Sequence, residues 1–301
     1  ITLNAVKENT LMGAVYVKDR NSSVSFGGIE GNDQTNTINS FAVIDNAGNL
    51  QADDSFAGKS VISALYAEGE GASITLTGDR NYLNTFANSG TDTQLERTVW
   101  AYSGAKIELD GWTSISTDNY DNSPNSLDVA VAAGTAVNLD EQQVIDNADP
   151  RSVVKINYKS SEGVGKSYIS GDILAAYAGD IAIKTEDNKA GLDVRGNLLS
   201  GNNGTLSVDL GTGGTLTGRV DDYGDVGIVE GIDHSAVFDP AFSSDIYRGG
   251  NTSLTMGNNS KWLVTGQSWI SNLEVKDGAQ GVEIDLVEAN TDRNQSAHAL
   301  T

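Results

Sequence analysis

The sequence predicts an all-β chain that winds into a right-handed, single-stranded parallel β-helix, a solenoid that ends in a C-terminal capping segment. Two observations lead to this fold class. Short pairs of apolar residues separated by one polar residue recur along the chain, and their spacing approaches a fixed interval of about 25 residues. A third observation agrees with them: Gly accounts for 34 of 301 residues, whereas apolar residues rarely recur at helical spacing.

The alternating pairs have the pattern of half-buried strands. Residues 74–76, 107–109, 206–210 and 282–286 all alternate between an apolar residue and a polar one. Because successive side chains of a strand point to opposite faces, this period of two places the apolar side chains on one face. Each pair therefore predicts a strand of three to five residues with one buried face.

The interval between these strands indicates coils that repeat along the chain. Ten residues mark the expected strands: Val24, Leu50, Ile74, Ile107, Val137, Ile156, Ile181, Leu206, Val229 and Leu254. Their separation averages about 25.6 residues, which is typical of solenoids, whereas a sandwich of antiparallel hairpins needs strands every 8–12 residues or so. Stacked roughly 4.8 Å apart, about a dozen coils would form a rod of about 55–60 Å.

Composition excludes several functional classes. The chain has 19 Lys and Arg against 41 Asp and Glu, and the resulting net charge of −22 opposes binding to a nucleic-acid backbone. It contains no Cys and only two His, His234 and His298, far apart in sequence, so we expect no metal site and no cofactor. No apolar run approaches the roughly 18 residues that a membrane-spanning helix needs.

Irregular segments divide the chain into three parts. Residues 1–250 are expected to form the coils, with protruding loops near 112–127 and 221–250, where polar residues and proline interrupt the pattern. Residues 251–289 are expected to form the capping segment. Residues 290–301 are polar, carry no strand signal, and are expected to be a linker or tail.

The segment 251–284 resembles the C-terminal end of the passenger domains of pertactin-like autotransporters. The resemblance rests on one motif and the strand after it: Ser260, Trp262, Val264, Thr265, Gly266, Ser268, Asn272, Leu273 and Val275. Trp269 departs from the family, which usually has a small apolar residue there. The match covers roughly the last fifth of the chain, and residues 1–190 resemble the family only in style.

The resemblance implies a secreted β-helix whose end is closed by a folding cap. The open end of a solenoid exposes strand edges and apolar interior, so a cap needs large apolar side chains. Trp262, Trp269 and Leu273 are expected to supply them. In the family, a linker and an outer-membrane barrel follow the cap. Since the 301 residues contain no barrel, we expect this chain to be the secreted part or a piece of it, anchored at the outer membrane of a Gram-negative cell and exposed on the bacterial surface.

Such a rod is expected to act in adhesion. Stacked coils align outward polar residues into ladders, and a weak contact repeated on many coils adds up. The expected partners are another copy of the chain on a neighbouring cell, as in aggregation and biofilm formation, or a host matrix protein or glycosaminoglycan. An anionic glycan would have to overcome repulsion by the acidic chain.

Charged and polar residues of these outward ladders are the candidate partner-binding residues. Part of this set comes from the tripeptide Asp-Arg-Asn, at 19–21, 79–81 and 292–294, which forms either a polar turn or an exposed polar row. The candidates are Lys18, Asp19, Arg20, Asp53, Asp54, Lys59, Asp79, Arg80, Asn81, Lys106 and Asp118.

The alternative is a polysaccharide-processing β-helix, either a lyase or a hydrolase like those of phage tailspikes. Lyases of this shape use Arg or Lys beside clustered carboxylates, and a hydrolase needs two carboxylates on either side of the scissile bond. Acidic pairs occur at 53–54, 186–187 and 221–222. No serine protease or lipase motif is present, and in an acidic rod most carboxylates solvate a face. We therefore expect no enzymatic activity.

Overall fold

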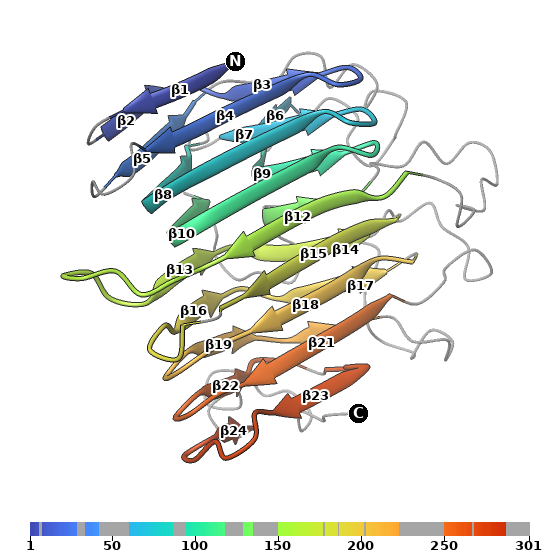
Figure 1. Cartoon of the computed structure of the whole chain (residues 1–301). Coiled ribbons are helices and arrows are strands. Elements are labelled where there is room, and N and C mark those ends of the chain that lie inside the picture. Colours follow the sequence, from blue (N-terminus) through green and yellow to red (C-terminus); the bar gives the residue numbers. More distant parts are fainter. Residues whose placement is uncertain are drawn as a thin grey trace, which may run out of the picture.

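The computed structural model is all-β. It describes residues 1–5, 8–28, 34–41, 60–86, 94–117, 129–134, 150–176, 178–185, 187–201, 203–222, 250–266 and 268–286. These residues form 24 strands and no helix, so the described part contains no apolar helix long enough to cross a membrane. The strands lie one above another from the N-terminal to the C-terminal end (Figure 1).

Parallel strands form three faces. A 16-stranded sheet supplies faces 1 and 2, and an 8-stranded sheet supplies face 3. Face 1 consists of β1 (Thr2–Ala5), β4 (Ser23–Gly28), the first half of β8 (Ser73–Thr85), the first half of β10 (Lys106–Thr117), β12 (Ser152–Asn157), β15 (Gly179–Lys184), β18 (Thr205–Asp209), β21 (Asn251–Met256) and β23 (Asn272–Val275).

The other two faces follow the same order. Face 2 consists of β2 (Glu8–Met12), β5 (Thr35–Ser40), the second halves of β8 and β10, β13 (Ser167–Ser170), β16 (Leu192–Arg195), β19 (Thr215–Gly218), β22 (Lys261–Val264) and β24 (Glu283–Asp285). Face 3 consists of β3 (Val15–Lys18), β7 (Leu65–Glu68), β9 (Gln94–Tyr102), β11 (Val129–Ala133), β14 (Asp172–Ala176), β17 (Leu198–Gly201) and β20 (Val220–Asp221), with β6 (Ser60–Ile62) paired to the start of β9.

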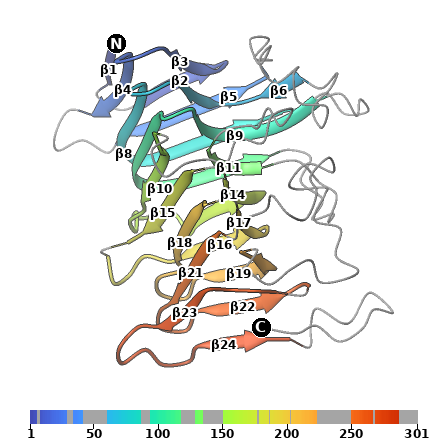
Figure 2. The ribbon, with the colours of Figure 1, turned by 90° about the vertical axis from the view of Figure 1, so that its right-hand side faces the viewer.

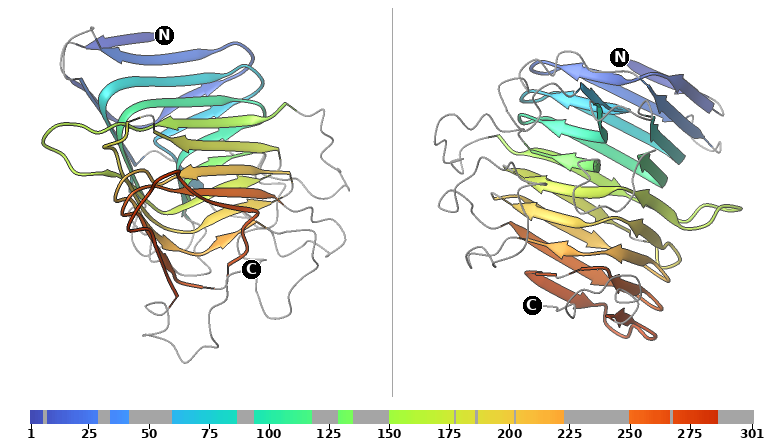
Figure 3. Two further views of the ribbon diagram at one scale, coloured as in Figure 1. Left: turned by 60° about the horizontal axis from the view of Figure 1, so that its bottom comes forward. Right: turned by 180° about the vertical axis from the view of Figure 1, so that it is seen from behind.

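Every pairing between these strands is parallel, and each strand pairs with the equivalent strand of the next coil. The chain therefore visits faces 1, 2 and 3 in turn and advances by one strand spacing per circuit, as Figures 2 and 3 show. This arrangement of parallel strands in curled sheets is consistent with a β-solenoid. The all-β prediction is confirmed.

The described coils are fewer than the sequence predicts. Face 1 contains nine strands, which at about 4.8 Å spacing span about 38 Å instead of 55–60 Å. Three expected strands, at Leu50, Val137 and Val229, lie outside the described residues. They add no coil to face 1, because β4 pairs directly with β8, β10 with β12, and β18 with β21. The interval between expected strands therefore overestimated the number of coils.

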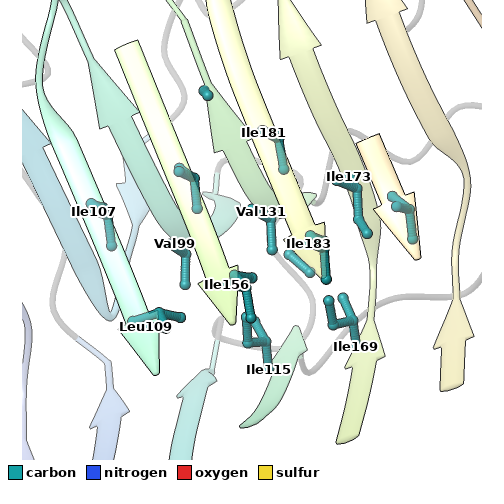
Figure 4. Close-up of a cluster of buried hydrophobic side chains, with 14 of the residues drawn as sticks. Val99, Ile107, Leu109, Ile115, Val131, Ile156, Ile169, Ile173, Ile181 and Ile183 are labelled. Carbon is teal, nitrogen blue, oxygen red and sulfur yellow. The ribbon is translucent and has the colours of Figure 1, made fainter. Parts of the chain in front are cut away.

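An apolar core fills the space between the three faces. Ile107, Ile181 and Leu206 come from face 1, Ile115 from face 2 and Val131 from face 3, and each is 2% exposed or less. Figure 4 shows side chains from all three faces meeting in this interior. Full burial of each such side chain contributes about 1.5–3 kcal/mol. The alternating apolar residues at 74–76, 107–109 and 206–210 thus point inward, as predicted, whereas Ile284 and Leu286 in the last strand region are 36% and 38% exposed.

A second apolar cluster lies on the outward side of face 3. The rings of Tyr16 and Tyr66 stack with their centroids 5.0 Å apart, and the ring of Trp100 follows 4.8 Å from Tyr66. The Glu68 carboxylate accepts hydrogen bonds from the hydroxyls of Tyr16, at 2.9 Å, and Tyr66, at 3.3 Å. Burial, followed by the Glu68 charge, raises the pKa of Tyr66 above its ordinary value.

The expected loop at 112–127 does not begin at Trp112. Residues 112–117 form the second half of β10, where alternation continues through Ile115, which is fully buried. Residues 118–127 lie outside the described part. In the second expected loop, at 221–250, Asp221 ends β20, and residues 223–249 are likewise not described.

The Asp-Arg-Asn tripeptides adopt two different structures. Asp19 and Asn21 have positive φ angles of 76° and 63° in a turn, as the polar-turn interpretation predicts. Residues 79–81 instead lie inside β8, where the chain bends from face 1 to face 2. The third tripeptide, at 292–294, and the expected tail at 290–301 lie outside the described residues.

The three residues expected to close the C-terminal end differ in burial. Trp262 is fully buried in the core, and its Nε1 donates to the Gly218 carbonyl oxygen at 3.0 Å. Leu273 is partly buried against the core, and Trp269 is half-buried. The last strands leave Val275 and Ile284 50% and 36% exposed.

A row of asparagines runs through the first coils. Asn9 donates to Asn36, Asn36 donates to Asn81, and Asn81 donates to the Asp110 carbonyl oxygen, each at 2.9 Å. Asn36 and Asn81 have no exposed surface. Since a buried amide without partners is costly, the parallel register stabilises this row by placing one amide directly above the next.

We expect Asn36→Ala to lower the free energy of unfolding by about 2–4 kcal/mol, because it leaves the buried Asn81 Oδ1 and the partly buried Asn9 Nδ2 without their partner. Asn39→Ala is the matched control. Asn39 is half-buried, accepts one hydrogen bond from Asn84 and donates a long, exposed one to the Met12 sulfur at 3.8 Å, so its loss should cost about 1 kcal/mol or less. Urea unfolding followed by circular dichroism measures both, and equal losses would contradict the ladder.

Candidate binding site

The candidate site lies where β8 and β10 bend from face 1 to face 2. Thr77 pairs with Asp110 and Arg80 pairs with Trp112, so Gly78 and Asp79 on β8 stand opposite a single Gly111 on β10. Two residues opposite one form a β-bulge, which bends the strand and redirects its side chains. The bulge places Asp79 and Arg80 at the corner.

Gly111 makes this corner possible. Its φ of +114° is unfavourable for any other residue, and a Cβ there would lie 1.8 Å from the Gly78 carbonyl oxygen. The two strands therefore approach as closely as backbone allows. A side chain at this position would push the coils apart.

The next coil inserts a loop at the same corner. Residues 158–166, the corner loop, connect β12 to β13 and protrude beside β13 in Figure 1. The buried Tyr158 fixes the start of this loop by donating to the Asp209 carbonyl oxygen at 2.8 Å. Ser160 fixes the next turn, because both its backbone N–H and its hydroxyl donate to the Asp187 carboxylate.

The corner loop reaches back across β10 to β8. Arg80 Nε donates to Ser161 Oγ at 2.9 Å, and Arg80 Nη2 donates to the Glu162 carbonyl oxygen at 2.7 Å. Trp112 Nε1 donates to the Gly165 carbonyl oxygen at 2.7 Å. The loop is therefore held at two points by strands of the two preceding coils.

A pocket of about 400 Å³ opens between the bulge and the corner loop. Eight residues line it: Gly78, Asp79, Arg80, Gly111, Lys159, Ser160, Ser161 and Glu162. Its volume is within the range of small-molecule sites, but its lining is polar instead of mostly apolar. Two basic and two acidic side chains balance each other, and two hydroxyls lie among them.

The carboxylate of Asp187 accepts hydrogen bonds from this loop. The hydrogen bond from the Ser160 hydroxyl, then those from the backbone N–H groups of Lys189 and Ser160, hold the pKa of Asp187 below its ordinary value. Hydrogen bonds to a carboxylate favour its charged form. The charge of Asp187 thus helps to fix the loop that walls the pocket.

The pocket brings together only two of the residues predicted from the sequence. Asp79 and Arg80 line it, and Asp79 also accepts the Gln34 backbone N–H at 2.9 Å. Asn81, the third member of that tripeptide, points into the asparagine row and is fully buried. Its side chain therefore does not reach the surface on which a partner would bind.

Four other candidates lie away from the pocket. Lys18, Asp19 and Arg20 are at the corner where the chain passes from face 3 to face 1, and Lys106 is at the start of β10 on face 1. Asp19 occupies the turn described above. The others form ion pairs: Lys18 with the buried Glu68 at 3.1 Å, Arg20 with Glu70, and Lys106 with Glu108 at 2.7 Å. The last two pairs lie at the surface, where such pairs stabilise a fold by about 0–1 kcal/mol. The remaining candidates, Asp53, Asp54, Lys59 and Asp118, lie outside the described residues.

Sequence reasoning missed the half of the pocket that comes from the corner loop. The polar run 159–162 follows a clear strand at 153–156, so its composition could have indicated a loop. Nothing local indicates that this loop contacts Arg80, about 80 positions earlier. Only the stacking of coils creates that proximity.

An outward row on face 2 adjoins the pocket. One residue from each of nine coils stands in register in this outward row: Thr10, Thr37, Tyr82, Ser114, Tyr168, Asp193, Thr215, Lys261 and Glu283. Tyr82 lies two residues after Arg80, and its ring centroid is 5.1 Å from that of Trp112. Tyr82, the first aromatic residue of the outward row, therefore lies close to the pocket.

Within the described ranges, no three His, Cys, Asp or Glu side chains gather closely enough to hold a metal ion. The acidic residues of the pocket are Asp79 and Glu162, with Arg80 and Lys159 in the same lining. This composition offers hydrogen bonds of both polarities instead of an oxygen cage for a cation.

No protein-family model, curated protein or solved structure matches this chain. The resemblance of residues 251–284 to autotransporter passenger domains therefore stays a prediction.

We expect Gly111→Ala to cost more than about 3 kcal/mol of stability and to disrupt the pocket, because the backbone has to move away from the Gly78 carbonyl oxygen. Gly213→Ala is the matched control. Gly213 also has a positive φ, +69°, but a Cβ there meets nothing within 4 Å. Its cost should be only the conformational penalty of about 1–2 kcal/mol. Denaturant unfolding of both variants tests this, and similar costs would refute it.

We expect Ser160→Ala to raise the pKa of Asp187 towards its ordinary value. In the wild type the folded pKa is depressed, so the stabilisation is present above the unfolded value, about 3.9, and is lost as pH falls through the lower folded value. Carbon-detected NMR of the Asp187 carboxyl gives both titrations. Ser114→Ala, on face 2, should leave the Asp187 curve unchanged, and a shift there would argue for a general effect on folding.

Proposed function

We propose that this chain is an adhesive β-solenoid that binds an extended partner along face 2. The outward row carries this proposal, because it presents one polar or aromatic side chain per coil over nine coils in register. Repetition makes each contact effectively intramolecular after the first has formed, so weak contacts sum to useful affinity. The row is geometrically suited to a long partner.

We further propose a handedness for the coils and a cap for the C-terminal end. The coils wind with the right-handed sense that parallel crossovers almost always adopt. Residues 251–289 close the C-terminal end, supported by the burial of Trp262 and the packing of Leu273 against the core. The chain is the exposed part of an autotransporter on a Gram-negative cell, as the resemblance of residues 251–284 implies.

Two kinds of partner fit this surface. Another copy of the chain on a neighbouring cell would pair row with row and cause aggregation or biofilm formation. A host matrix protein or glycan would lie along the row instead. The chain carries a net charge of −22, so a strongly anionic partner is disfavoured.

A second candidate function is cleavage of a polysaccharide. The observation that favours it is the presence of Asp79 and Glu162 in one pocket with Arg80 and Lys159, which are the residue types that hydrolases and lyases use. However, Arg80 is engaged by Ser161 and the Glu162 carbonyl, and Asp79 accepts a backbone N–H. These contacts favour a binding role for the pocket.

Placing Lys at both Ser114 and Thr215 should reduce adhesion about tenfold or more, because two bulky charges interrupt the outward row. Beads coated with the protein are tested for clumping and for retention on matrix-protein and glycan surfaces. The control places Lys at Ser25 and Ser207, which are in register with each other through the strands of face 1. If the face 1 variant loses adhesion equally, or neither does, face 2 is not the adhesive surface.

Binding without cleavage is the expected result when the wild-type protein is incubated with a panel of polysaccharides and the products are separated by size. Release of shorter chains that disappears in Glu162→Gln and Asp79→Asn would establish the enzyme instead. The same incubation at several pH values covers a catalytic carboxyl with a different optimum.

A further inference from the structure

The pocket at the β8–β10 corner has a lining that selects by hydrogen bonding. Its side chains are Asp79, Arg80, Lys159, Ser160, Ser161 and Glu162, and the remaining lining comes from two glycines. No aliphatic or aromatic side chain takes part. An apolar ligand would therefore strip water from charged groups without replacing their hydrogen bonds, which is unfavourable.

Charge balance restricts the ligand further. Asp79 and Glu162 oppose an anion, as does the net charge of −22, whereas Arg80 and Lys159 oppose a cation. A neutral ligand with many hydroxyls meets neither penalty. Each hydroxyl donates to a carboxylate and accepts from an ammonium, a guanidinium or a serine, so it matches a lining of mixed polarity.

The pocket is partly preorganised for such a ligand. Arg80 is fixed by the corner loop, and Asp79 by the Gln34 backbone N–H. The side chains of Lys159 and Glu162 are exposed at the rim, and neither makes a hydrogen bond or ion pair with the described residues. Fixed groups reduce the entropy lost on binding, and the rim groups remain available to the ligand.

Aromatic side chains continue from the pocket onto face 2. Trp112 pairs with Arg80 across the strands, and Tyr82 lies against Trp112. Tyr168 stands in the same outward row as Tyr82, with Ser114 between them, so the two tyrosines are about 10 Å apart at the usual strand spacing. Half-buried tyrosines offer a ring face and a hydroxyl, which suits the apolar face and polar edge of a sugar ring.

From this geometry we infer that the pocket holds one unit of a neutral, hydroxyl-rich glycan whose chain continues over Tyr82 and Tyr168. The inference rests on the proposed adhesive function and names the chemistry of the partner. Asp79 and Glu162 accept hydrogen bonds from sugar hydroxyls. Arg80 and Lys159 donate to hydroxyl and ring oxygens.

An array of immobilised neutral, uronate-containing, sulfated and amine-bearing glycans tests the inference with the full chain. We expect retention on neutral glycans, with little change between low and high salt, because no net charge is neutralised. Lys159→Ala and Glu162→Gln should each weaken that binding about tenfold or more, as the loss of a charged hydrogen bond does. Both side chains are exposed, so the variants should fold.

Matched controls have the same chemical changes away from the pocket. Lys184→Ala and Glu274→Gln alter exposed side chains at the end of β15 and on β23. Both should bind the neutral glycan like the wild type. Thermal unfolding of all four variants verifies that the fold is intact.

Three results would overturn the inference. Retention only on charged glycans, with strong salt dependence, would assign a different ligand class. Retention on neutral glycans that Lys159→Ala and Glu162→Gln leave unchanged would place the glycan elsewhere. If no glycan is bound but coated beads still clump or adhere to matrix protein, the glycan inference is refuted and the proposed adhesive function is retained. Loss of adhesion in every assay would instead refute the proposed function itself.

Discussion

Backbone hydrogen bonding between equivalent strands of successive coils is the constraint on which the structure depends. Because each strand pairs in parallel with the strand one coil further on, equivalent side chains stack in rows. The same register produces three different results. Inward aliphatic rows such as Ile107 and Ile181 form the core, buried Asn36 and Asn81 satisfy each other, and outward residues such as Tyr82 and Ser114 form a continuous surface. Core, ladder and binding surface are consequences of one pairing rule.

The candidate site arises where that regularity is interrupted. Gly111 lets two strands bend closely together, whereas the coil that follows carries the additional residues of the corner loop between β12 and β13. The loop folds back over β10, and its contact with Arg80 encloses a pocket that no single coil possesses. An insertion into a repeated structure thus creates a unique site, while the flanking coils keep its walls in place.

Much of the fold was accessible from the sequence, because alternation of apolar and polar residues is a local property that a strand preserves. Ile74, Ile107, Ile181 and Leu206 were recognised as strand residues and are in register in face 1. The number of coils was not accessible, since residues between paired strands count towards the spacing but add no strand to face 1. The pocket was only half accessible. Asp79 and Arg80 stood out as a repeated polar tripeptide, whereas their partners Ser161 and Glu162 depend on how coils stack.

The contact between Arg80 and the corner loop also alters how the rod would come apart. In a solenoid each coil ordinarily contacts only its two neighbours, so under tension it peels away one circuit at a time. Arg80 belongs to β8, but its guanidinium is bonded to a loop that leaves β12, with β10 lying between them. This link passes over the coil that contains β10, so the coils that contain β8, β10 and β12 are held together as one unit. A pulling force that reaches this point must break the side-chain link before the middle circuit can be released.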